Sequence, residues 1–93
     1  MRLQERICVI TGAASGFGRA IAERFASEGA RLALNDINGD ALDEVVKKLA
    51  TDQVIARVGD VSQARVADDL VDEAAQRWGG IDVLVNNDHI CID

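Results

Sequence analysis

The stretch Thr11-Gly12-Ala13-Ala14-Ser15-Gly16-Phe17-Gly18 decides how this chain folds. The apolar run at residues 7–10 just before it is rich in β-branched side chains and too short for a helix, so we expect a buried strand there. After it, apolar residues recur at helical spacing, which predicts a helix over 16–28 that ends at Gly29. The glycines therefore lie in a turn between a strand and a helix.

A turn of this kind is suited to an anion. The first backbone N–H groups of the helix have no partner within the helix, and they point into the turn together with the positive end of the helix dipole. Glycines leave room for a pyrophosphate to reach those groups, which predicts a dinucleotide cradle. Glycines that only ease a tight turn are the alternative. A mononucleotide P-loop is excluded, because neither Gly16 nor Gly18 is followed by lysine.

Composition excludes several classes of partner. The formal net charge is −6, and no basic patch offsets it, so we expect neither nucleic acid nor an anionic membrane as a partner. No apolar segment is long enough to span a membrane, and the first six residues do not resemble a signal peptide. Cys8 and Cys91 are expected to be free thiols, and neither has metal-ligand spacing with His89. These features predict a cytoplasmic protein without a metal site.

The rest of the chain alternates between strand and helix patterns. Further helices are expected after the N-caps Asn38 and Ser62, the second ending at Gly79, and the expected strands cover residues 7–10, 31–36, 54–58 and 82–87. This alternation predicts an α/β fold, namely a Rossmann-like three-layer α/β/α domain over residues 1–93. Its parallel sheet of about four strands should have the order 3-2-1-4, with the glycine turn at the switch point. Such a domain is half of a doubly wound fold.

Acidic and amide side chains end three of the expected strands. Asp36 lies where a carboxylate can accept hydrogen bonds from an adenosine ribose and repel a 2′-phosphate, which favours NAD over NADP; capping the local turn is the alternative. Asp60 and Val61 are placed to contact adenine, although Asp60 is equally suited to begin a helix. Asn86 and Asn87 end the fourth strand, where asparagines often bond only their own turn.

These motifs together resemble the amino-terminal half of the short-chain dehydrogenase/reductase family. The matching segments are the glycine turn at 11–18, Asp36, the pair at 60–61, and Asp82-Val83-Leu84-Val85-Asn86-Asn87. The resemblance implies that the glycine turn binds the pyrophosphate of NAD, that Asp36 selects NAD, and that Asn87 lies near the adenosine ribose. The predicted cofactor-binding residues are Gly12, Ser15, Gly16, Phe17, Gly18, Asp36, Ile37, Asp60, Val61 and Asn87.

The chain departs from the family pattern in two places. Asp88 and His89 stand where the family has Ala-Gly after the two asparagines, and they add bulk and charge beside the ribose. The family's serine and Tyr-x-x-x-Lys motif belong to the other half, and this sequence has no tyrosine. No catalytic residue is therefore predicted, and hydride transfer between NAD(H) and an alcohol or carbonyl is not expected of this chain alone.

Two other functions remain open from the sequence. The chain could be a non-catalytic module that binds an adenine nucleotide. It could also be an interaction fragment, because the fourth strand would be an edge with unpaired backbone groups and a bare apolar surface. We therefore expect a homo-oligomer or another association through that edge. A partner chain that completes the active site would be a further case.

Overall fold

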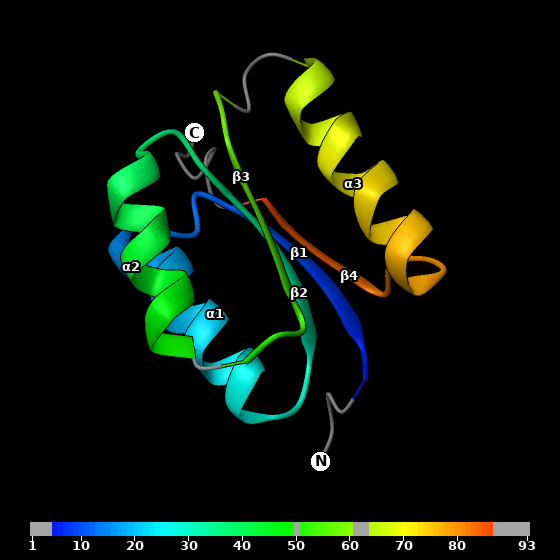
Figure 1. Ribbon diagram of the computed structural model, residues 1–93, viewed down its shortest axis with the longest axis horizontal. Helices are drawn as coiled ribbons and strands as arrows, with labels where there is room; N and C mark the ends of the chain where they lie inside the picture. The colour runs from blue at the N-terminus through cyan, green and yellow to red at the C-terminus, as the bar shows by residue number, and fades with distance from the viewer. Residues whose placement is uncertain (1–4, 50, 61–63, 87–93) are drawn as a thin grey trace.

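The computed structural model describes residues 5–49, 51–60 and 64–86. Strands and helices alternate along these residues as predicted (Figure 1). The elements are β1 (Ile7–Thr11), α1 (Gly16–Ser27), β2 (Arg31–Asp36), α2 (Gly39–Leu49), β3 (Val54–Val58), α3 (Ala64–Trp78) and β4 (Val83–Asn86).

The strands form one parallel sheet with the order β3-β2-β1-β4. This order confirms the prediction, and it places the end of β1 at the switch point between β2 and β4. Every residue of β1 is buried, as are all but the first of β2. Most of β3, by contrast, is exposed at the sheet edge. The β-branched run at residues 7–10, which predicted a strand, therefore lies in a central strand of the sheet.

Helices cover both faces of the sheet, which gives the predicted three layers. α1 and α2 lie together on one face and α3 lies on the other (Figure 1). Because side chains alternate along a strand, successive residues of β1 and β2 enter different cores. One core joins Cys8, Ile10, Leu32 and Leu34 to Ala22, Leu42 and Val45. The other joins Ile7, Val9, Ala33 and Ile55 to Leu70 and Ala74 of α3.

The helix ends follow local sequence signals. α1 ends at Ser27, one residue earlier than predicted, and Gly29 then adopts φ +87°. Asn38 caps α2, since its Oδ1 accepts a hydrogen bond from the backbone N–H of Ala41 at 3.1 Å. Gly79 follows α3 with φ +95°, a conformation that glycine adopts without a steric penalty. The predicted cap Ser62 lies outside the described residues.

β4 lies at an edge of the sheet. It pairs with β1, and no other described strand lies against its second side. Val83 and Val85 are half-buried against the core that faces α1, whereas Leu84 on the opposite side of the strand is 57% exposed. Within the described part of the chain, no helix has the length and apolar character required to cross a membrane.

Candidate functional site: the carboxyl ends of β1 and β2

The glycine turn is folded back on itself, so that it leaves the start of α1 uncapped by a side chain. Gly12 follows β1 with φ +63°, in the left-handed region that favours glycine. The hydroxyl of Ser15 donates to the carbonyl oxygen of Gly12 at 2.8 Å. Ser15 is the N-cap residue of α1, yet it makes no side-chain hydrogen bond to the helix, whose first turn contains no acidic residue. This end of α1 is therefore electrostatically suited to an anion.

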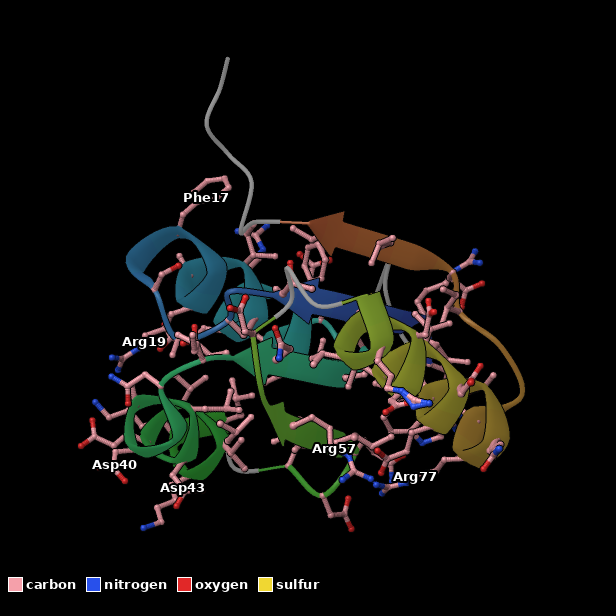
Figure 2. The ribbon with its side chains drawn as sticks, turned by 90° about the horizontal axis from the view of Figure 1, so that it is seen from above. Phe17, Arg19, Asp40, Asp43, Arg57 and Arg77 are labelled. Carbon is pink, nitrogen blue, oxygen red and sulfur yellow. The ribbon has the colours of Figure 1, made fainter. Side chains whose placement is uncertain are left out.

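The first three residues of α1 differ in how exposed they are. A Cβ placed on Gly16 would meet no atom of the described residues within 4 Å, so the space beside this glycine is open in the described part of the chain. Phe17 is 67% exposed and projects away from the sheet (Figure 2). Gly18 is buried on the inner side of α1. The structure thus places Gly16 on the open side of the cradle and Gly18 in the packing beneath it.

Asp36 ties the glycine turn to the end of β2. Its side chain is largely buried, with the residue 8% exposed. Oδ2 accepts a hydrogen bond from the backbone N–H of Ala14 at 2.9 Å, and Oδ1 accepts one from the N–H of Asn38 at 2.9 Å. The sequence predicted a ribose acceptor or a local cap. The structure contains the cap and adds the bond to the turn, while a carboxylate with about four acceptor positions retains capacity for a hydroxyl.

Asn35 is a site residue that the sequence analysis missed. It is 1% exposed, and its Nδ2 donates to the carbonyl oxygens of Arg57 and Gly59 at 3.2 and 3.1 Å. Its own carbonyl oxygen accepts from the N–H of Ala13 at 2.8 Å. The available signal was an amide inside a strand whose other residues are mostly apolar. Such a side chain is normally buried only when it is hydrogen-bonded.

The remaining predicted cofactor-binding residues either lie near the carboxyl ends of β1 and β2 or fall outside the residues that the structure describes. Ile37, next to Asp36, is 68% exposed. Asp60 is exposed and directly follows Gly59, which is held to β2 by its backbone N–H to the oxygen of Asp36 at 3.1 Å. Val61 and Asn87 lie outside the described residues. The end of β4 is nevertheless placed, because Asn86 is in register with Thr11 at the end of β1.

Cys8 lies in the sheet interior and is not a nucleophile at neutral pH. Its side chain is buried at 0% exposure, in keeping with the predicted free thiol. The pKa of the thiol is raised from 9.0 to about 11, mainly by burial and also by the negative charge of Asp82, while Arg6 lowers it in part. The thiolate is the reactive form of cysteine, so this group stays protonated and inert.

A groove of about 480 Å³ between β3 and α3 is a poor site for a dinucleotide. Its lining residues are Arg57, Val58, Val66, Asp69, Asp72, Glu73 and Gln76. The one cation among them, Arg57, is already paired with Glu73 through Nε and Oε1 at 2.6 Å. The remaining carboxylates would repel a pyrophosphate. The uncapped start of α1 is therefore the better anion site.

A parallel sheet of this order, with a glycine turn at the switch point and a carboxylate at the end of the next strand, defines a Rossmann-like fold. The sequence profile described as short chain dehydrogenase matches residues 6–90. The chain therefore belongs to the short-chain dehydrogenase/reductase family.

Individual relatives are similar over nearly the whole chain. An uncharacterized oxidoreductase of Mycobacterium bovis is 47% identical over 92 residues, which is 98% of this chain and 37% of the relative. A short-chain dehydrogenase/reductase of Brucella melitensis, described as a glucose/ribitol dehydrogenase, superimposes with a TM-score of 0.84 at 40% identity over 88% of this chain and 35% of its own. One from Burkholderia phymatum, solved in complex with NAD, has a TM-score of 0.83 at 40% identity, over 90% of this chain and 31% of its own. The chain thus spans about a third of the length of these relatives.

Proposed function

We propose that this chain is the NAD(H)-binding part of a short-chain dehydrogenase/reductase, and that it prefers NAD to NADP. The family's reaction is hydride transfer between the nicotinamide of the cofactor and an alcohol or carbonyl. The observation that carries the proposal is the pairing of an open, uncapped helix start at Gly16 with the buried carboxylate of Asp36 one strand away. The Burkholderia relative with bound NAD supports it.

The residues present fit the two ends of an adenylate. The uncapped start of α1 suits a pyrophosphate, and the open space beside Gly16 is the room that a side chain at this position would fill. Asp36 has acceptor capacity for the ribose hydroxyls and carries a charge that opposes a 2′-phosphate. Arg19, three residues after Gly16, offers that phosphate little, because its Nε pairs with Glu23 Oε2 at 3.1 Å.

A titration of the whole chain tests this proposal. NAD and ADP-ribose should raise the melting temperature in a concentration-dependent way, because a ligand that binds only the folded state stabilises it. NADP should bind about tenfold more weakly or worse, a difference of about 1.4 kcal/mol, because its extra phosphate faces Asp36. Equal affinity for NAD and NADP would contradict the cofactor preference, and no stabilisation by any adenine nucleotide would contradict the binding function.

The catalytic step is not proposed for this chain acting alone. The sequence has no tyrosine, which is the family's usual proton donor. Hydride transfer by the isolated chain should therefore be undetectable, and activity that arises only when a second polypeptide is added would identify a partner that completes the site. Activity of the purified chain by itself would contradict this part of the proposal.

We also propose a second role, association through β4. The specific observation is Leu84, which is 57% exposed on a strand that is paired on one side only in the described structure. An unpaired parallel strand with an apolar side chain is a ready template for another strand. The wild-type chain should be dimeric or larger in light scattering at micromolar concentration, and Leu84→Lys should lower that mass. A monodisperse wild-type monomer would contradict the association.

A further inference from the structure

Asn35 is a polar side chain that is almost completely buried, which is energetically unfavourable unless its polar groups are hydrogen-bonded. It lies in the interior strand β2, in register with Arg57 of β3, and it is 1% exposed. An unpaired amide in such a place is destabilising, so the polar groups of a buried asparagine are normally all hydrogen-bonded. Here only half of the amide is paired: Nδ2 donates twice, whereas Oδ1 is buried and has no hydrogen-bond partner in the described structure.

The paired half of the amide holds the exit of β3. Both acceptors, the carbonyl oxygens of Arg57 and Gly59, lie where β3 leaves the sheet toward Asp60. The segment that follows β3 is also confined by α3. A Cβ on Gly59 would lie 3.1 Å from two methyl groups of Val66 on α3, which is already a tight approach.

The backbone of the same residue holds the glycine turn. The carbonyl oxygen of Asn35 accepts from Ala13, and the next residue, Asp36, accepts from Ala14 through Oδ2. Asp36 also accepts the N–H of Gly59 through its backbone oxygen. The Asn35–Asp36 pair is therefore bonded to both the glycine turn and the loop after β3, and the separation of those two segments depends on it.

We propose that Asn35 is a positioning residue for the adenosine end of the dinucleotide. Its Nδ2 fixes the Gly59–Asp60 segment at a set distance from the glycine turn, so that the two segments together accommodate the adenosine. This inference rests on the proposed NAD-binding function and deepens it. It accounts for a buried amide whose Nδ2 donates to two carbonyl oxygens of the same segment.

The test separates the adenosine end of the ligand from its phosphates. Asn35→Leu keeps the volume and the charge but removes the donor from both carbonyl oxygens. ADP-ribose affinity should fall about tenfold or more, whereas the affinity for inorganic pyrophosphate, followed through the Gly16 amide signal by NMR, should change by less than about twofold. The control Val9→Ala removes buried volume from the same core without touching the loop, and it should lower the melting temperature while leaving the affinity ratio of the two ligands unchanged.

Each outcome bears on one of the two claims. If wild-type chain binds ADP-ribose and Asn35→Leu binds it equally well, or loses both ligands in parallel, the positioning role is wrong. If wild-type chain binds neither ligand, the proposed function fails and this inference fails with it. Should Asn35→Leu not fold, the wild-type side-chain amide protons of Asn35 decide: slow exchange with solvent and a shift on ADP-ribose addition support the role, and rapid exchange or no shift at saturation overturns it.

Discussion

Two aspartates at opposite ends of the sheet bind backbone N–H groups in the same way but differ in what compensates their charge. At the start of β4, Asp82 Oδ2 accepts from the N–H of Ile7 at 2.9 Å, and Oδ1 lies 3.7 Å from a guanidinium nitrogen of Arg6. At the end of β2, Asp36 accepts from two N–H groups and has no ion pair with any described residue.

The more exposed of the two aspartates is the one that has a cationic partner. The side chain of Asp82 is 39% exposed and paired, whereas Asp36 as a residue is 8% exposed and unpaired. A nearly buried carboxylate without a cation is expensive unless its hydrogen bonds are good. At the amino end of the sheet the charge of Asp82 is compensated by Arg6, whereas at the carboxyl end the charge of Asp36 has no cationic partner among the described residues. The following four experiments can break or sharpen this contrast.

The largest effect is expected on NAD binding when Gly16 in the glycine turn is replaced. Gly16→Asp should weaken NAD binding at least about a hundredfold, or about 2.7 kcal/mol, because a carboxylate would fill the space open to the pyrophosphate. The unliganded chain should retain its melting temperature within a few degrees, since a Cβ there meets no atom of the described residues within 4 Å. Gly16→Ala is the matched control for bulk without charge. Undiminished NAD-induced stabilisation of Gly16→Asp would place the ligand elsewhere.

The second effect concerns the amino half of the sheet and appears only at alkaline pH. The pKa of Cys8 is about 11 in the folded chain against 9.0 for an ordinary cysteine thiol, so the unfolded chain loses this proton first. Stability is complete below about pH 9 and should fall by up to about 2 to 3 kcal/mol as the pH rises to about 11. Urea unfolding at several pH values measures the slope, and Cys8→Ala should flatten it. An equal slope in Cys8→Ala would rule the thiol out as the cause.

The third effect tests the unpaired carboxylate. Asp36→Asn should lower NAD affinity about tenfold and bring NAD and NADP closer together, because the charge that opposes the 2′-phosphate is gone. It should also cost about 1 kcal/mol of stability, since a charged acceptor for Ala14 and Asn38 is replaced by a neutral amide. Calorimetry with both cofactors provides the comparison. An unchanged preference for NAD would remove Asp36 from the selection.

The smallest effect is expected at the other aspartate. Asp82→Asn should cost about 1 kcal/mol or less, because its partner Arg6 is 59% exposed at the side chain and solvent screens the pair. NAD affinity should not change. The pKa of Cys8 should fall, since the charge of Asp82 is one of the causes that raise it. A loss of NAD binding in Asp82→Asn would mean that the two ends of the sheet are not independent.

The sequence by itself determined the order of the elements, the parallel sheet and the position of the glycine turn. These follow from local signals: the apolar run before Gly12, the alternation of strand and helix patterns, and the glycines that end α1 and α3. Each signal involves residues close together in the chain. The strand order 3-2-1-4 was expected from the Rossmann-like fold that these signals indicate, and the structure has that order.

Only the tertiary structure decided what the side chains at the end of β2 contact. Asp36 reaches Ala14, which is 22 residues away, and Asn35 reaches Arg57 and Gly59, which are 22 and 24 residues away. Hydrogen bonds of this kind depend on the register of three strands, and no pattern along one strand contains that information. The sequence could therefore predict Asp36 as a site residue, whereas the contacts of the buried amide beside it became visible only once β1, β2 and β3 were placed together.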